Sequence, residues 1–243
     1  MIGVIVRAVP DLVEGLEISE REVLPYRYMA NEMDEYAVEQ AVILKERYGF
    51  DVDVIGLANE EAYSEIDDAL FTAIARGVDR AYKIMIPKTT SYKIARALSD
   101  ILKKYDLILT GTIAIDEYYG LLSSLIAHEL KIPYIGSVIG VEIDGEDLIV
   151  KKELEGGLIG VLRLKKPAVL GIITSERPPR YIPFSRLREV MKSHEIKEID
   201  LSIEEEELDV TFKEPPEPKV EFIEGTADEI AEKLAKILRE MIT

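Results

Sequence analysis

Short apolar runs alternate with helix-like segments through the first half of the chain. Four runs of apolar, mostly β-branched or leucine side chains cover residues 2–9, 51–57, 80–86 and 107–109, and each is short enough for one strand. Between them, apolar residues recur at helical spacing, as in the segment 31–48. Strands that alternate with helices of about a dozen residues predict an α/β fold: a parallel sheet with right-handed crossovers and flanking helices.

The segment 105–136, YDLILTGTIAIDEYYGLLSSLIAHELKIPYIG, contains the most informative turn. A strand at 107–109 is followed by small and polar residues at 110–120 and then by a helix at 121–130. Parallel sheets bind ligands at the carboxyl ends of their strands, where the free amides of a helix N-terminus suit a phosphate. We therefore predict a Rossmann-like crevice that holds a nucleotide in the turns after the first, second and fourth strands. The alternative is an ordinary turn that binds nothing.

Polar residues predict where two of the helices begin. Asn31 is expected to cap the first helix, because its side-chain oxygen can accept a hydrogen bond from the amide of Asp34. Asn59 and Glu60 are expected to start the second helix. A plain cap, with no ligand involved, is the alternative role for Asn31.

The pattern changes after Pro133. Strand-like runs now follow one another without helices between them, and Asp144-Gly145 favours a tight hairpin turn. We therefore expect an antiparallel extension of the sheet. The apolar run that follows Lys166-Pro167 is a candidate to rejoin the parallel part.

The segment 176–184 is rich in proline, which favours an extended surface conformation over a helix or a central strand. A short helix at 186–193 and an edge strand at 197–202 are expected to follow.

We divide the chain into two parts. Residues 1–200 are expected to form the α/β nucleotide-binding domain with its antiparallel extension, and residues 201–243 a C-terminal arm and helix. The arm, 203–225, is acidic and broken by prolines, whereas the helix at 226–242 has one apolar face. That face needs a surface to pack on, either its own domain or a partner subunit.

Composition excludes several classes of function. The net charge of −17 disfavours nucleic-acid or anionic-membrane partners. No window is apolar enough for a membrane span and the amino terminus lacks a signal peptide, so a soluble cytoplasmic protein is expected. The absence of cysteine excludes thiol chemistry, and two histidines are too few for a His-rich metal site.

No combination of residues in the sequence suggests catalysis. His128 falls within a predicted helix and is interpreted as a packing or capping group. Asp116 and Glu117 are interpreted as acids that solvate a turn, not as a general acid and base. We expect neither catalytic residues nor a metal site.

Five phrases, in order, give the chain a resemblance to the β subunit of electron transfer flavoproteins. They are NEMDEYAVEQAVILKERYG (31–49), TAIARGVDRAY (72–82), YDLILTGTIAID (105–116), ELEGGLIGVLRLKKPAVLGI (153–172) and ERPPRYIPF with its later VMK (176–192). They resemble the family patterns N-P-F-(D/E)-x-x-A-V-E-E-A, A-L-A-M-G-A-D-R-A, D-L-(I/V)-L-x-G-x-x-A-I-D, (D/E)-G-G…P-A-V and N-E-P-R-Y…I-M-K. The resemblance covers roughly residues 1–200.

This resemblance implies an electron carrier and not an enzyme. The chain would pair with an electron transfer flavoprotein α subunit, which holds most of the FAD, and would itself bind AMP as a structural ligand. In the bifurcating branch of the family, a second FAD takes the place of AMP. Electrons would pass from a dehydrogenase to an acceptor such as a quinone reductase.

The resemblance also assigns roles to individual residues. The nucleotide contacts would be the backbone of Ile5 together with Asn31, Glu32, Met33, Asp34, Ala58, Asn59, Gly111, Thr112, Ile113, Ala114, Ile115, Asp116 and Gly120. A partner-docking segment would cover residues 180–192 and include Arg180, Tyr181, Phe184 and Leu187, with Phe184 or Leu187 as the apolar anchor.

The chain departs from the family pattern in three places. After Ala-Ile-Asp, EYYG replaces a longer Gly/Gln-rich segment that holds phosphates, Met33 stands where an aromatic residue is usual, and KSHEIK replaces a basic run after I-M-K. AMP, FAD or no nucleotide thus remain open for the crevice. The alternative function is a nucleotide-binding regulatory module of the same fold without electron transfer. An ATP pyrophosphatase is disfavoured, because the chain lacks an S-G-G-x-D-S loop.

Overall fold

The computed structural model describes residues 1–20, 22–206, 209–214, 216 and 220–242. Its strands are β1 (Ile2–Pro10), β2 (Leu16–Ile18), β3 (Val23–Pro25), β4 (Tyr28–Ala30), β5 (Val52–Ala58), β6 (Arg80–Met85), β7 (Leu107–Gly111), β8 (Tyr134–Asp144), β9 (Asp147–Glu153), β10 (Ile159–Lys165), β11 (Ala168–Ile172) and β12 (Lys197–Glu198). Its helices are α1 (Glu32–Tyr48), α2 (Ile66–Arg76), α3 (Ser91–Leu102), α4 (Leu121–Leu130), α5 (Phe184–Ser193) and α6 (Ala227–Ile242), with a short 3-10 turn η1 (Glu155–Gly157).

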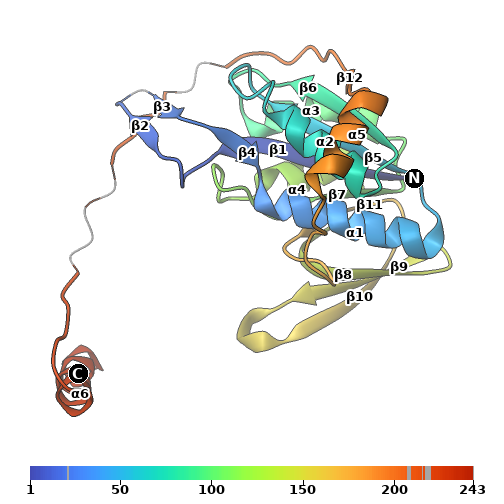
Figure 1. The fold of residues 1–243 in the computed structure, drawn as a ribbon. Helices are drawn as coiled ribbons and strands as arrows, with labels where there is room; N and C mark the ends of the chain where they lie inside the picture. The colour runs from blue at the N-terminus through green and yellow to red at the C-terminus, as the bar shows by residue number, and fades with distance from the viewer. Residues whose placement is uncertain (21, 207–208, 215, 217–219, 243) are drawn as a thin grey trace.

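Strand β1 lies in the middle of the main sheet (Figure 1). It pairs in parallel with β5 on one side and with β7 on the other, and the full strand order is β10-β9-β8-β11-β7-β1-β5-β6-β12. Most of β1 is buried, as expected for a β-branched run covered on both faces. The predicted α/β class with a parallel sheet is confirmed.

Helices cover both faces of the sheet. On one face, Leu44 of α1 and Leu70 of α2 pack with Val4 in one apolar core. On the other face, α3 and α4 form a second core, to which Leu98 and Ile126 contribute. Complete burial of such a side chain stabilises the fold by about 1.5–3 kcal/mol, so these two cores hold the three layers together.

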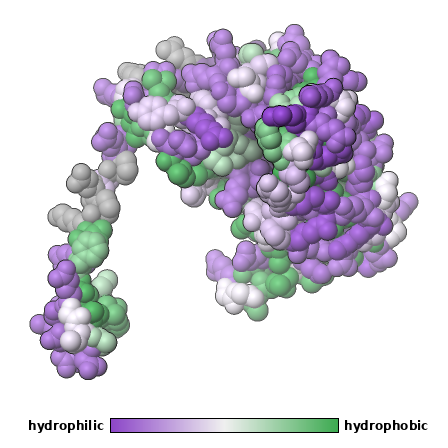
Figure 2. All heavy atoms as spheres, viewed as in Figure 1, coloured by the Kyte–Doolittle hydropathy of each residue, from purple (hydrophilic) through white to green (hydrophobic). Residues whose placement is uncertain are grey.

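The second half of the sheet is the predicted antiparallel extension. Strands β8, β9 and β10 pair antiparallel, and Gly145 takes the left-handed conformation in the turn between β8 and β9. Strand β11 then returns between β7 and β8 and is parallel to both, which confirms that this run rejoins the sheet. The edge strand β10 leaves Ile159 and Val161 exposed, and Figure 2 shows hydrophobic atoms on this hairpin.

Two local expectations differ from the structure, and one segment without a stated expectation contains strands. The segment before α1, which shows no sequence period, contains the β2–β3 hairpin, and β4 pairs with β1. Helix α2 begins only at Ile66, because the side chain of Asn59 accepts from the amide of Ala62 and closes a separate turn first. Helix α5 begins at Phe184, with Pro183 at its N-cap position.

The C-terminal helix α6 lies away from the α/β body (Figure 1). Thr226 and Glu229 cap its start reciprocally, since each backbone amide donates to the other's side chain. Its apolar stripe is exposed, with Leu234, Ile237 and Met241 among the large exposed side chains. Part of the predicted arm, at 207–208, 215 and 217–219, lies outside the described residues.

Candidate functional site

The predicted crevice lies where β1 and β7 end side by side. The chain leaves β1 toward β5 and β6 and later returns to the other side of β1 as β7, so the strand order reverses between these two strands. Ligands of open α/β sheets bind at such a reversal, outside the carboxyl ends of the strands. Helix α1 follows β1 and β4 on one side, and the loop 112–120 follows β7 on the other.

Asn31 and Asp34 form the floor of this crevice. The carboxylate of Asp34 accepts from the backbone amide of Arg7 at 2.8 Å and from that of Gly111 at 2.6 Å. The side-chain amide of Asn31 donates to the carbonyl of Ile113 at 3.0 Å. These bonds connect the start of α1 to the ends of β1 and β7.

The capping role expected for the side chain of Asn31 is wrong. Asn31 does occupy the N-cap position of α1, but the amide of Asp34 bonds to its backbone carbonyl at 3.0 Å. The side chain turns across the crevice instead, because Ile113 offers an acceptor there. Met33 also reaches the floor: a Cβ added at Gly111 would lie 2.8 Å from the Cβ of Met33.

Burial dominates the electrostatics of Asp34. The side chain is 1% exposed, and loss of hydration raises the pKa of its carboxyl group above the ordinary value. The charge of Arg7 and the hydrogen bonds from the amides of Arg7 and Gly111 act in the opposite direction.

The loop 112–120 is attached to both β1 and α3. The guanidinium of Arg7 donates to Glu117 at 3.1 Å, and the hydroxyl of Ser91 donates to both carboxylate oxygens of Glu117 at 3.0 Å. Gly120 ends the loop at a φ of 59°, which favours glycine. Glu117 therefore does not merely solvate a turn, and that interpretation is corrected here: the side chain is 23% exposed and makes an ion pair.

The remaining predicted contacts are spread around this floor. Ile5 and Ala58 are buried within β1 and β5, and the carbonyl of Ala58 accepts from the amide of Ile86. Asn59 bonds within its own turn, and the hydroxyl of Thr112 accepts from the amide of Ser137. Ala114 is buried, whereas Glu32, Ile115 and Asp116 are exposed.

Sequence reasoning missed Arg7 and Ser91 as members of this site. Arg7 is the one charged residue in an otherwise apolar β1, which is the signal that was present in the sequence. Ser91 begins a helix, and nothing local distinguishes it from a structural serine.

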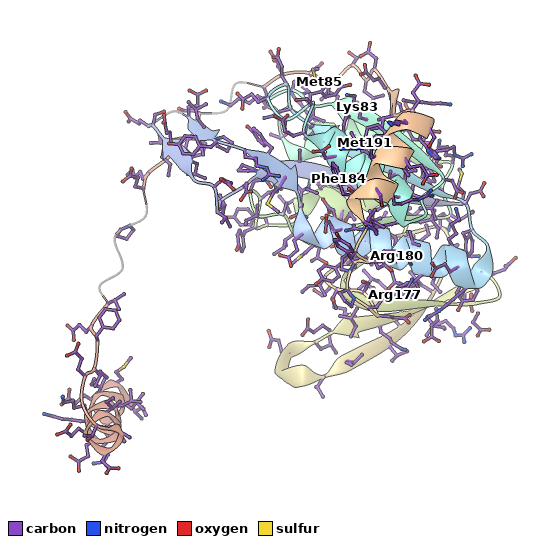
Figure 3. All side chains as sticks on the ribbon, viewed as in Figure 1. Lys83, Met85, Arg177, Arg180, Phe184 and Met191 are labelled. Carbon is purple, nitrogen blue, oxygen red and sulfur yellow. The ribbon has the colours of Figure 1, made fainter. Side chains whose placement is uncertain are left out.

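A second cluster of charges holds the proline-rich segment 176–184 on α1. The side chain of Glu39 is fully buried and accepts from Arg177 at 2.7 Å and from Arg180 at 2.9 Å. The same two arginines bind Glu46, at 2.7 Å and 2.6 Å. Figure 3 shows Arg177 and Arg180 between this segment and α1. The predicted docking residue Arg180 thus anchors the segment to its own chain.

These ion pairs shift the acidity of both carboxylates. Burial acts to raise the pKa of Glu39, but hydrogen bonds from Arg180 and Arg177 outweigh it and lower the pKa. Hydrogen bonds from Arg180, followed by those from Arg177, lower the pKa of Glu46 to about 2. Both groups are ionised at neutral pH. Glu39, Glu46, Arg177 and Arg180 therefore form a clamp of ion pairs that holds the proline-rich segment on α1.

The other predicted docking residues lie beside a surface cavity of about 450 Å³ between α1, α2 and the proline-rich segment. Tyr181 and Leu187 are among its lining residues, with Leu187 half-buried. Phe184 is 65% exposed at the start of α5, and the guanidinium of Arg188 lies 4.8 Å from the centre of its ring. Figure 3 labels Phe184 at the start of α5.

Within the described residues, no three His, Asp or Glu side chains are grouped so as to hold a metal ion. No helix in the same part of the chain is long and apolar enough to cross a membrane. His128 is exposed in the last turn of α4, so its predicted packing role is wrong, although it lies where a basic group suits the helix dipole.

A family model described as the electron transfer flavoprotein domain matches residues 26–204. The chain belongs to the electron transfer flavoprotein β-subunit family. The β subunit of Bacillus subtilis is 30% identical over 226 residues, which cover 87% of this chain and 86% of the relative. The human β subunit is 30% identical over 224 residues, with 88% and 86% covered, and that of Thermoanaerobacterium thermosaccharolyticum is 32% identical over 186 residues, with 73% and 70% covered.

The match to the electron transfer flavoprotein domain includes both clusters described above, except for Arg7, which precedes it. It begins before Asn31 and extends through the crevice loop, the proline-rich segment and α5. Helix α6 lies beyond its end. The family therefore covers the floor of the crevice and the candidate docking surface, whereas the C-terminal helix has to be interpreted from its own residues.

Proposed function

We propose that this chain is an electron-carrying β subunit that pairs with an α subunit and holds FAD jointly with it. In this role it passes electrons from a dehydrogenase to an acceptor such as a quinone reductase. Family membership along most of the chain supports the proposal. FAD supplies the redox chemistry, so the chain itself has to provide a binding surface and a docking surface.

The rim of the crevice fits a flavin that a partner subunit covers. Ile115, Tyr118 and Tyr119 of the loop 112–120 are 42%, 75% and 86% exposed, which is unusual for large apolar and aromatic side chains. Their place beside the switch point offers a flat, largely apolar surface to an isoalloxazine ring. These side chains are exposed in the single chain, and the α subunit would bury them in the proposed complex.

The docking role is supported by an exposed apolar side chain on a segment that is held in place. Phe184 is 65% exposed, yet it is the last residue of the segment 176–184, which Arg177 and Arg180 hold on α1. Apolar anchors on pre-organised segments bind without a large cost in ordering. We propose that a redox partner receives Phe184 in an apolar pocket.

Co-expression with an α-subunit homologue tests the assignment as a whole. We expect a stable complex with one flavin, which is released by denaturation and identified as FAD by chromatography. A complex that forms but contains no flavin would contradict the proposed function.

The docking role predicts a selective kinetic defect. Phe184→Ala should slow electron delivery from the partner dehydrogenase about thirtyfold, because an anchor in a desolvated pocket contributes about 2 kcal/mol. The flavin content and its visible absorbance should not change.

Tyr26→Ala is the matched control, since Tyr26 is also 65% exposed but lies in the β2–β3 hairpin region. Stopped-flow transfer rates compare the three proteins. Equal transfer rates for Phe184→Ala and the parent would contradict the proposal that Phe184 belongs to the docking surface.

A further inference from the structure

The carboxylate of Glu117 occupies the position of an anion at the mouth of the crevice. It accepts from the guanidinium of Arg7 and from the hydroxyl of Ser91, and the side chains of Arg7 and Glu117 are 13% and 23% exposed. A half-buried ion pair of this kind is shielded from solvent and is retained more firmly than a surface pair. Glu117 is thus part of a built contact and not a free surface acid.

The groups around Glu117 are those that commonly bind phosphate. A guanidinium and a serine hydroxyl meet at the first residue of α3, and the N-terminus of a helix attracts negative charge. The first turn of α3 contains no acidic residue of its own. Glu117, from a different element, therefore supplies the negative charge at this helix end.

The floor of the crevice is filled in the same way. The amides of Arg7 and Gly111 point to the carboxylate of Asp34, and a Cβ added at Gly111 would lie 2.5 Å from Oδ1 of Asp34. The side-chain amide of Asn31 is used by the carbonyl of Ile113. The backbone amides of Arg7 and Gly111 are thus already bonded within this chain.

The residues of the crevice therefore do not fit AMP, the ligand implied by the family resemblance. Arg7 contacts this loop through its ion pair with Glu117, so the charge of the guanidinium is already balanced within the chain. We propose that Glu117 acts as an internal anion in the place of a phosphate, with Asp34 below it, and keeps the crevice closed to adenine nucleotides.

This inference does not depend on the flavin, which the proposed function places at the rim and in the α subunit. A closed crevice disfavours the alternative function, a nucleotide-binding regulatory module, because such a module needs an open crevice. It also gives the short EYYG turn a role, since this turn brings Glu117 within reach of Arg7 and Ser91.

Nucleotide analysis of the purified complex with the α subunit provides the first test. We expect FAD but well under one adenine mononucleotide per chain after denaturation and chromatography, and no heat of binding when AMP is titrated. One AMP per chain, or a second FAD per complex, would overturn the proposal, whereas a single FAD per complex would leave the electron-transfer assignment intact.

A variant tests the role of Glu117 directly. Glu117→Ala should free Arg7 and Ser91 and strengthen binding of inorganic phosphate and AMP about tenfold or more, measured by calorimetry. Asp116→Asn removes a neighbouring charge in the same loop and serves as the control, with a smaller gain expected. If Glu117→Ala gains no phosphate binding while its circular dichroism matches that of the parent, Glu117 is not the internal anion.

Discussion

A single buried carboxylate, that of Asp34, joins three elements at the centre of the molecule. It belongs to α1 and accepts from backbone amides at the ends of β1 and β7. Each of these amides would otherwise be buried without a partner, and an unsatisfied buried donor costs about 1–3 kcal/mol. Asp34 is therefore a structural residue of the crevice.

Asp34→Asn is expected to lower the free energy of unfolding by about 1–3 kcal/mol, because the amides of Arg7 and Gly111 bind different oxygens of Asp34 and one of these becomes an NH2 donor in asparagine. Urea unfolding followed by circular dichroism measures the difference. Glu32→Gln, an exposed acid in the same helical turn, should leave stability nearly unchanged. Equal stability of Asp34→Asn and the parent would refute the role of Asp34.

The clamp on the proline-rich segment should depend on pH. Because folding lowers the pKa of Glu46 from 4.5 to about 2, the stabilisation is complete above the unfolded value and is lost as pH falls through the folded one. Glu46→Gln should cost less than about 1 kcal/mol at neutral pH, since the pair is partly exposed.

The difference between Glu46→Gln and the parent should shrink as the pH is lowered from 5 toward 3 in urea unfolding. Glu146→Gln, in the exposed turn of the β8–β9 hairpin, controls for a general loss of charge. A constant difference across this pH range would exclude the ion pair as its cause.

Helix α6 has an exposed apolar face that a partner subunit could bury. Its stripe of Leu234, Ile237, Leu238 and Met241 is exposed, although one face of an amphipathic helix is normally buried. Hydrophobic atoms are visible on this helix in Figure 2. We propose that residues 201–243 serve as an assembly arm that packs on the α subunit.

Deletion of residues 203–243 should abolish co-elution with the α subunit while the α/β body stays folded. Complete burial of each large apolar side chain contributes about 1.5–3 kcal/mol, so the loss of affinity should exceed tenfold. Size-exclusion chromatography and circular dichroism report on assembly and folding.

Leu234→Glu places a charge in the apolar stripe of α6 and should weaken assembly in the same way. Glu232→Gln alters a charged residue of the same helix and is the matched control. If both the deletion variant and Leu234→Glu co-elute with the α subunit as the parent does, the proposed assembly role of residues 201–243 is wrong.

At the scale of the whole molecule, the sequence predicted the features that follow from local hydrophobic periodicity. It did not predict the contacts between residues far apart in the chain. Alternating runs predicted the parallel sheet, because strand and helix periods are local properties. The carboxyl-end rule predicted a crevice in the turns after the first, second and fourth strands, and the family resemblance assigned Asn31, Asp34 and Gly111 to it. The bonds among them were not predictable, since they join residues far apart in the chain.

The clamp shows the same limit. Glu39 and Glu46 lie about two turns apart on one side of α1, which was visible in the sequence as a spacing. Nothing local indicated that Arg177 and Arg180, which follow β11, would return to them. The place of Arg180 in a docking segment stays a prediction, whereas its ion pairs with α1 were not predicted.

Helix α1 takes part in both clusters, with its first turn in the crevice floor and its outer side under the proline-rich segment. In the proposed function, one hydrogen-bonded helix and not a flexible loop would lie between a protein docked on Phe184 and a redox group at the crevice rim. Electron tunnelling weakens steeply with distance. A carrier whose two binding surfaces are joined by a helix would keep nearly the same tunnelling distance at every encounter with a donor or acceptor.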